Sequence, residues 1–457
     1  MKTISSQSRQ ILSDTITPIG TFLNLRDVFP ATSLFESSDF HRRSNSRSFI
    51  GADPIVRMSC EKGRVVVRTE TRVEESELRS AEELQKLIDG FQFQNEELNP
   101  RNGFFGALAY ESVGMFEQIE LSNSDELPEF HLVIYRYLLV FDNFKNEVLL
   151  IENSLDSNFQ GLDRIIQLVY QSRNYRSGFR TSGSAVSNYT DSEFEDLILK
   201  AKDHIAAGDV FQLVLSRKFY QDFTGDDFEV YRRIRALNPS PYMFYFDLDK
   251  FHLFGASPEA QFKLEDGVAE INPIAGTVKR TGNLDTDNQL STQLAKDAKE
   301  NAEHTMLVDL ARNDLNRYCD DVIPIRFKEI QEFSHVIHMV SKVRGKLKKG
   351  ARPIEAFGSS FPAGTLSGAP KYRAMQLIDQ YENQSRGFYG GAIGHLAANG
   401  DMNFAIVIRT CLSDGKRLEY QAGAGVVMDS DPGMEVEEVY NKSRVINRAI
   451  ALANQEL

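Results

Sequence analysis

The stretch from Ala405 to Arg444 reads AIVIRTCLSDGKRLEYQAGAGVVMDSDPGMEVEEVYNKSR. An apolar strand containing Arg409 is followed by a turn at Asp414-Gly415 and by a glycine-rich bend, Gly423-Ala-Gly425, whose bare N–H groups can meet an anion. A helix then places three charged side chains on one face: Glu435, Glu438 and Lys442. This combination suits a small polycarboxylate that is bound through a divalent cation.

The composition excludes several classes of protein. The formal net charge of the 457 residues is -13 and the basic residues are dispersed, so we expect no nucleic-acid surface. No apolar run approaches the roughly 18 residues of a membrane span, and residues 1–10 lack the apolar region of a signal peptide. The three cysteines show no C-x-x-C spacing, which argues against a disulfide framework and a zinc site. We therefore expect a cytoplasmic protein.

Hydrophobic periodicity predicts an α+β protein with large antiparallel sheets, because strands come in hairpins more often than they alternate with helices. Residues 1–60 look irregular, and the polar stretch 172–188 indicates a linker. A capping box at Thr190 and Glu193 opens a helix that should end at Gly208. We expect two domains, residues 1–180 and residues 189–457. Further expectations are strands at 63–69, 104–110, 132–141 and 147–152 and a long helix at 287–315.

Two pairs of glutamates are candidate metal ligands. Glu300 and Glu303 are three residues apart on a predicted helix, and Glu435 and Glu438 repeat that spacing on another. A single such pair is more often a solvated acidic face. Four convergent carboxylates would repel one another unless a cation lay between them, and Mg²⁺ prefers such oxygen ligands. The two pairs together therefore indicate a magnesium site.

Four further features each allow a structural and a functional interpretation. The small-residue loop Phe361–Lys371 can be a plain turn or an anion cradle at a helix N-terminus. Arg409 needs either a structural carboxylate or a ligand carboxylate as its partner. His338 can be a core histidine or a catalyst. Tyr389, between the glycines of Gly387–Gly391, marks either a strand kink or a phenol that is offered to a ligand.

Taken together, these motifs resemble the chorismate-utilising enzymes, and among them most closely component I of the anthranilate synthases. The resemblance covers nearly the whole second half of the chain. The matching stretches are Gly255–Glu259, Pro273–Thr277, Glu303–Leu315, Phe361–Lys371, Gly387–Gly391 and Gly423–Gly425. It implies a sandwich of two large antiparallel sheets with helices outside, and a chorismate site in the domain at residues 189–457.

The resemblance also implies a role for each matching residue. Glu303 and Glu438 would ligate Mg²⁺ directly, and Glu300 and Glu435 would act through its waters. Glu259 would protonate the departing C4 hydroxyl, and His338 would support the later loss of pyruvate. Assisting residues would be Thr365 and Lys442. The substrate contacts would come from Gly276, Thr277, Tyr389, Arg409, Gly423, Ala424 and Gly425.

The nucleophile follows from two absent amines. Water-adding relatives resemble one another in carrying a lysine base where this chain has Gln212, and p-aminobenzoate relatives often carry an attacking lysine in place of Ala275. A free nucleophile, ammonia, is therefore implied. The chain has no Gly-x-Cys-x-Gly turn of the kind that a glutaminase needs, so a separate glutamine amidotransferase subunit should supply the ammonia in a hetero-oligomer.

The N-terminal Leu34-Phe35-Glu36-Ser37 resembles the family's tryptophan feedback element Leu-Leu-Glu-Ser, with phenylalanine as the second residue. Asn238–Met243 resembles the other wall of that site, although an ordinary amphipathic turn would also explain the first stretch. The expected inhibitor contacts are Leu34, Glu36, Ser37, Pro239, Tyr242 and Met243.

The resulting expectation is a magnesium-dependent lyase that converts chorismate and ammonia to anthranilate and pyruvate, the first committed step of tryptophan synthesis. Two alternatives remain: an aminodeoxychorismate synthase component of the folate pathway, or a non-catalytic tryptophan or chorismate sensor.

Overall fold

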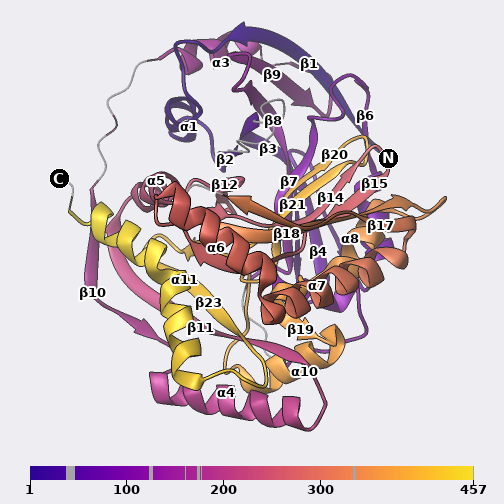
Figure 1. Ribbon diagram of the computed structural model, residues 1–457. Helices are drawn as coiled ribbons and strands as arrows, with labels where there is room; N and C mark the ends of the chain where they lie inside the picture. The colour runs from indigo at the N-terminus through magenta and orange to yellow at the C-terminus, as the bar shows by residue number, and fades with distance from the viewer. Residues whose placement is uncertain are drawn as a thin grey trace.

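A computed structural model describes residues 1–37, 47–122, 127–159, 161–171, 175, 178–332 and 336–455, apart from the side chains of Ala275, Thr277 and Lys299. The chain forms large antiparallel sheets with helices around them (Figure 1). None of the helices in these ranges has the length and apolarity to cross a bilayer.

One continuous path of antiparallel pairings runs through most of the strands. Its first part, in order of pairing, is β10 (Phe179–Ser187), β11 (Gln212–Gly225), β23 (Arg417–Val426), β22 (Thr410–Ser413), β13 (His252–Ser257), β12 (Tyr242–Asp247), β2 (Ser33–Glu36), β3 (Arg47–Glu61) and β8 (Phe130–Asp142). It continues through β7 (Gly103–Leu108), β20 (Ala392–Ala397), β21 (Met402–Ile406), β14 (Ala260–Glu265), β15 (Val268–Ile271) and β18 (Val336–Leu347).

The remaining strands extend this path at its sides. β16 (Ile274–Lys279) and β17 (Cys319–Glu332) both pair with β18, and β19 (Gly368–Ala369) pairs with β11. On the N-terminal side lie β4 (Arg64–Thr69), β5 (Val73–Glu77), β9 (Glu147–Ser154), β1 (Lys2–Leu12) and β6 (Phe91–Phe93). The β1–β6 contact is parallel.

A sandwich core lies between the sheets, and helices cover the outer faces. Phe105 of β7, Phe244 of β12 and Ile393 of β20 belong to the same buried cluster. A second cluster packs one group of helices on the sheets: α1 (Pro18–Arg26), α3 (Leu162–Val169), α4 (Asp191–Ala206), α5 (Phe228–Leu237), α10 (Lys371–Tyr381) and α11 (Pro432–Ala453). A third does so for α2 (Ala81–Asp89), η2 (Tyr110–Met115), α7 (Ala298–Asn316) and α8 (Pro353–Ser360). The predicted helix-covered antiparallel sandwich is therefore confirmed.

Local sequence accounts for the ends of several helices. Thr190 and Glu193 form the predicted capping box of α4, and Gly208, with φ +81°, follows the end of that helix. α11 begins at Pro432 after Asp431, whose side chain accepts from the N–H of Met434.

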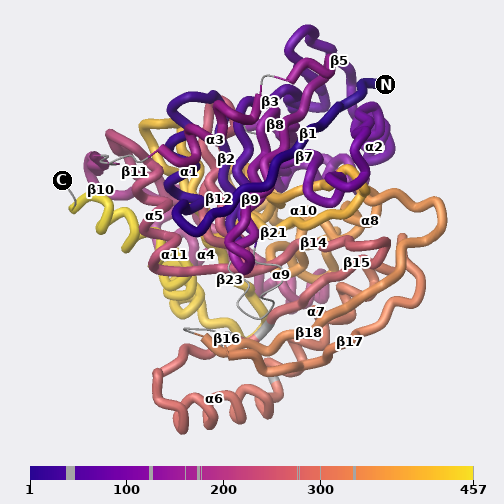
Figure 2. Tube along the Cα trace, turned by 90° about the horizontal axis from the view of Figure 1, so that it is seen from above, coloured from indigo at the N-terminus to yellow at the C-terminus, as the bar shows by residue number. Residues whose placement is uncertain are grey.

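Three predictions of local structure were wrong. Residues 1–60 contain β1, α1, β2 and the long strand β3, which is buried on both faces over much of its length and so shows no clear alternation. The predicted linker contains β10, which pairs with β11. The long helix expected at 287–315 is two helices, α6 (Leu284–Lys296) and α7, because Asp297 caps α7 by accepting from the N–H of Glu300. Figure 2 shows α6 at the periphery.

The boundary between the two expected domains stays a prediction. Strand pairing crosses it at two places: β2 pairs with β12, and β7 pairs with β20.

Candidate active site

Glu259 lies just after β13 and contacts the loop that contains Thr365. The Thr365 hydroxyl, in the short helix α9 (Gly364–Ser367), donates to the Glu259 carboxylate at 3.3 Å. Burial raises the pKa of Glu259 to about 7, and the Thr365 hydrogen bond and the positive charges of Arg409 and Lys442 oppose that rise. A carboxyl whose pKa is near neutrality keeps a substantial protonated fraction at pH 7 and can donate a proton to a leaving group.

Arg409 is placed in a bend between β21 and β22, not inside a strand as the sequence predicts. Its φ of 53° lies in the left-handed region, which ends strand geometry and is a strained conformation for a non-glycine residue. Its guanidinium has no hydrogen bond or ion pair within the described ranges of the chain. Burial lowers its pKa, and the nearby charges of Glu259 and Glu438 oppose that effect. A partly buried guanidinium with no partner among the described residues is suited to a ligand carboxylate.

The glycine-rich segment of β23 brings backbone close to two side chains. Gly423 and Gly425 pair with Ser216 and Val214 of β11. A Cβ at residue 423 would lie 2.8 Å from the Tyr389 hydroxyl, and one at residue 425 would lie 2.9 Å from Nε2 of Gln212. β11 pairs with β23 on one side as far as Val426, whereas β22 pairs with it on the other side only as far as Tyr420. In the described pairings, no strand therefore lies beside Ala424 on that second side. Glycine is needed here for close approach.

Helix α11 presents Lys442 and Glu438 to the same segment. The Lys442 ammonium donates to the Gly423 carbonyl at 2.9 Å and lies 3.3 Å from a Glu438 carboxylate oxygen. Both side chains are about half exposed. Glu435, one turn earlier, is partly buried.

Helix α7 presents the other glutamate pair. Nε2 of Gln212 donates to Glu303 at 3.2 Å, which connects α7 to β11 beside Gly425. A Cβ on Gly276 would lie 3.0 Å from a Glu300 carboxylate oxygen. One member of each pair therefore lies near the glycine segment of β23, Glu303 through Gln212 and Glu438 through Lys442. Across the described residues, however, no three His, Cys, Asp or Glu side chains are spaced to hold one metal ion together.

His338 of β18 is positioned by the chain opposite it. It pairs with Thr277, and its Nδ1 lies 3.1 Å from the carbonyl oxygen of Gly276, which can only accept. Nδ1 therefore carries the proton, and Nε2 is the acceptor. Burial lowers the pKa of His338, so the imidazole is neutral near pH 7. The side chain of Thr277 is outside the described part, and Gly276 has a φ of 65°.

Residues 33–448 match the model of the chorismate binding enzyme family. Anthranilate synthase component 1 of Aquifex aeolicus is 36% identical over 98% of this chain and 94% of its own length, and that of Bacillus subtilis is 36% identical over 96% and 91%. The chain belongs to the chorismate binding enzyme family.

Solved structures agree with this membership. Anthranilate synthase component I from Streptococcus pneumoniae aligns with a TM-score of 0.75 and 31% identity, over 96% of this chain and 99% of that one. The menaquinone-specific isochorismate synthase of Escherichia coli aligns with a TM-score of 0.76 at 18% identity, over 98% and 95% of the two chains, and so shows the shared fold.

In this chorismate binding enzyme, the two stretches predicted to bind tryptophan lie on neighbouring strands. Met243 pairs with Glu36, and Tyr245 pairs with Leu34. The Glu36 carboxylate accepts from the Tyr231 hydroxyl and from two nitrogens of Arg235, so it is an internal structural partner of α5. The remaining predicted contacts lie nearby in sequence, with Pro239 exposed, Tyr242 bonded to Asn403, and the Ser37 N–H bonded to the carbonyl of residue 47.

Sequence reasoning missed a cavity of about 40 Å³ beside Glu259. Its lining includes Gln261 and Asn272, whose side-chain oxygens are buried and have no partner in the described ranges. A polar cavity of this size has room for about one or two water molecules.

It also missed Glu382 and Arg386, which are buried and ion-paired. The sequence signals were the i,i+4 spacing of the two residues and the position of Arg386 directly before the Gly387–Gly391 motif.

Proposed function

We propose that this enzyme is the chorismate-binding component of an anthranilate synthase and converts chorismate and ammonia to anthranilate and pyruvate. The observation that carries this proposal is the placement of Glu259, whose pKa is raised to about 7, near Arg409, whose guanidinium has no partner among the described residues. The relatives support it, since those named above are anthranilate synthase component 1.

Each side chain has a role in this reaction. Arg409 and the Tyr389 hydroxyl bind the substrate carboxylates, and Glu259 gives its proton to the C4 hydroxyl, which leaves as water while ammonia bonds to C2. Gln212 cannot deprotonate water, because a side-chain amide is not a base at neutral pH. Nε2 of His338 then accepts the C2 proton as the C3–O bond breaks and the ring becomes aromatic. The enolpyruvate that leaves takes up a proton at its methylene carbon and becomes pyruvate, and the ammonium formed at C2 releases its extra proton, which restores the acid form of Glu259.

The donor chemistry fits a magnesium ion. Mg²⁺ is usually bound through one or two carboxylates, several waters and the substrate, so a cluster of three protein ligands is not required. Glu303 and Glu438 would hold the ion and Glu300 and Glu435 would bind its waters. When bound, the ion neutralises substrate carboxylate charge.

Three further parts of the proposal concern the setting of the enzyme. A separate glutamine amidotransferase subunit supplies ammonia, since relatives are named as component 1 and this chain lacks a glutaminase cysteine turn. The pair acts in the cytoplasm. Tryptophan inhibits the enzyme through β2 and the segment that leads into β12.

The deciding experiment mixes the purified chain with chorismate, an ammonium salt and Mg²⁺. Anthranilate fluorescence that grows with time supports the proposal. Chromatography identifies the contradicting outcomes: aminodeoxychorismate, isochorismate, or chorismate that is bound but not converted.

A further inference from the structure

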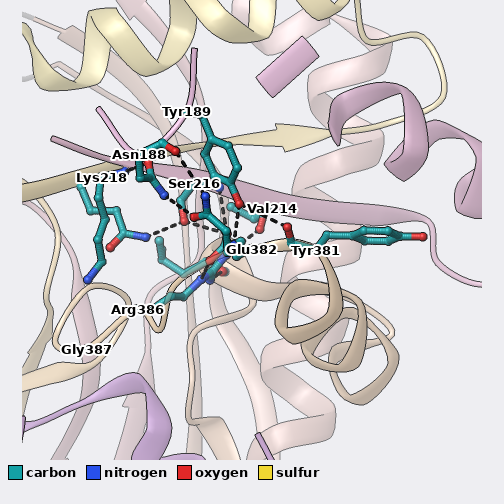
Figure 3. A network of polar contacts seen from close by, with 12 residues as sticks. Asn188, Tyr189, Val214, Ser216, Lys218, Tyr381, Glu382, Arg386 and Gly387 are labelled. Atoms are coloured by element: carbon teal, nitrogen blue, oxygen red, sulfur yellow. Dashed lines mark hydrogen bonds and ion pairs between the residues drawn. The ribbon is translucent and has the colours of Figure 1, made fainter. Parts of the chain in front are cut away.

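A buried ion pair lies where α10 ends and the segment leading to Tyr389 begins. Arg386 is 2% exposed and Glu382 is 5% exposed. The guanidinium donates two hydrogen bonds to the carboxylate, from Nε to one oxygen at 2.9 Å and from Nη2 to the other at 2.7 Å. Figure 3 shows this pair at the centre of a network of polar contacts. Bidentate geometry fixes the plane of the guanidinium, which a single contact would not do.

The other donor contacts of Arg386 reach two walls of the active site. Nη1 donates to the Leu366 carbonyl at 2.5 Å, directly after Thr365 in the chain. Nη2 donates to the Val214 carbonyl at 2.8 Å, on the β11 residue that pairs with Gly425. One guanidinium thus connects the loop that hydrogen-bonds Glu259 with the strand beside the glycine-rich segment.

Glu382 ties the same pair to β11. Its Oε1 accepts from the backbone N–H of Ser216 at 2.9 Å and from the Ser216 hydroxyl at 2.7 Å. Ser216 pairs with Gly423 of β23. Both glycines of the substrate segment therefore lie opposite residues that the ion pair fixes.

Aromatic and backbone contacts complete the surroundings of Arg386. Its guanidinium lies 4.8 Å from the ring centre of Tyr110 and 5.7 Å from that of Tyr389. The buried carboxylate of Glu111 accepts from the backbone N–H groups of Arg386 and Gly387, at 2.8 Å and 3.2 Å. The chain that leads into Tyr389 is therefore fixed on both sides.

We propose that Arg386, oriented by Glu382, is a positioning residue that sets the distance between the Thr365 loop, Tyr389 and the glycine segment of β23. A buried ion pair is weak evidence for added stability, because well-packed apolar side chains often serve as well. What apolar side chains cannot supply is a rigid fork that bonds two separate walls of the site. The inference rests on the proposed function, since it assigns the site to conversion of chorismate.

The test compares Arg386→Lys with a matched control, Arg136→Lys. Lysine keeps the charge beside Glu382 but lacks the planar fork whose separate nitrogens bond Glu382 and the two carbonyls. Arg136 is likewise buried and ion-paired, yet its partners Asp53 and Glu70 lie outside the site. We expect Arg386→Lys to lower kcat roughly 10- to 100-fold with KM for chorismate changed by less than about threefold, and Arg136→Lys to leave both unchanged. Thermal unfolding of both variants is measured alongside.

Two results would overturn the inference: wild-type kcat in Arg386→Lys, or an equal loss of kcat in Arg136→Lys. If Arg386→Lys does not fold, the double variant Glu382→Gln, Arg386→Gln removes both charges together and leaves none buried alone. The same kcat loss is expected there, and full activity contradicts the inference. The kcat of each variant is divided by the kcat of the wild type, measured for whichever product the wild type forms from chorismate. A wild type that makes a product other than anthranilate therefore refutes the proposed function, while the kcat ratio still tests the role of Arg386.

Discussion

At the scale of single residues, the site depends on how burial changes charge. Glu259 and His338 are both shifted toward their neutral forms, so one can donate and the other can accept a proton near pH 7. Arg409 stays charged because its pKa starts far above neutrality. The sequence identified all three residues by motif, but only their packing shows which protonation states they take.

The first prediction concerns pH. In the proposed mechanism the acid form of Glu259 is the active form, and its raised pKa of about 7 means that this form is present below pH 7 and lost as pH rises through that value. We expect kcat/KM for chorismate to fall about tenfold per pH unit above this pKa. The assay must keep free ammonia constant by adjusting total ammonium at each pH. A rate that is flat from pH 6 to pH 9 would contradict the assignment.

The Glu259→Gln variant gives a second, independent check. Glutamine keeps the shape of the side chain but cannot supply the proton, so kcat should fall by roughly 10²- to 10⁴-fold, while chorismate affinity stays near that of wild type. Affinity is measured by calorimetry without ammonia. Loss of binding together with turnover would show that Glu259 holds the substrate and does not act as the acid.

The magnesium proposal is also tested at one residue. Glu438→Gln removes a carboxylate from the face of α11 near Lys442 and Arg409, whereas Glu437→Gln removes an exposed carboxylate one position earlier. We expect the first variant to need about 10- to 100-fold more Mg²⁺ for half-maximal activity, as is typical when metal-site residues are changed, and the second to match wild type. Identical magnesium titrations for both variants would remove Glu438 from the proposed site.

At the scale of elements, the sequence predicted most where local signals act alone. The capping box of α4 and the turn at Gly415, with φ +83°, follow from two or three residues each. β3 was missed because burial on both faces removes the alternation that marks a strand. The bend at Arg409 was missed because its apolar neighbours continue the strand pattern, and only the packing around β21 and β22 ends the strand there. Glu382 and Arg386 have the i,i+4 spacing of a helical ion pair, but α10 ends at Tyr381, so their pairing depends on tertiary packing and not on a helix.

The two glycine positions of the C-terminal strands should respond differently to alanine. At Gly425 the added Cβ meets the flexible end of Gln212, so Gly425→Ala should displace that side chain from Glu303 and lower kcat/KM with little loss of stability. At Gly415 no atom is close, but the left-handed turn disfavours a side chain, so Gly415→Ala should lose about 1 kcal/mol of stability and no activity. Urea unfolding measures the stability of both variants, and anthranilate assays measure their activity. The prediction is contradicted if each variant loses both stability and activity.

At the scale of the whole molecule, the N-terminal half is joined to the active site by strand pairing. β2 lies between β3 and β12, and β12 pairs with β13, which ends two residues before Glu259. A ligand that altered the spacing of β2 and β12 would therefore act on β12, which pairs directly with β13, the strand that leads to Glu259. This arrangement gives the proposed tryptophan inhibition a physical route, because paired strands connect the proposed tryptophan site to the strand that leads to Glu259.

We accordingly expect tryptophan at millimolar concentration to lower the anthranilate rate of wild type, whereas phenylalanine at the same concentration should not. Tyr242→Ala removes a ring at the start of β12 that bonds Asn403 of β21, so this variant should keep ammonia-dependent activity and lose most of the inhibition. The matched control Tyr170→Ala removes a half-exposed ring at the end of α3 and should remain inhibited. Because Glu36 is already bonded to Arg235 and Tyr231, recognition of the tryptophan ammonium would require that carboxylate to exchange partners. Arg235→Met should then change the tryptophan concentration that halves the rate, and unchanged inhibition in both Tyr242→Ala and Arg235→Met would place tryptophan elsewhere.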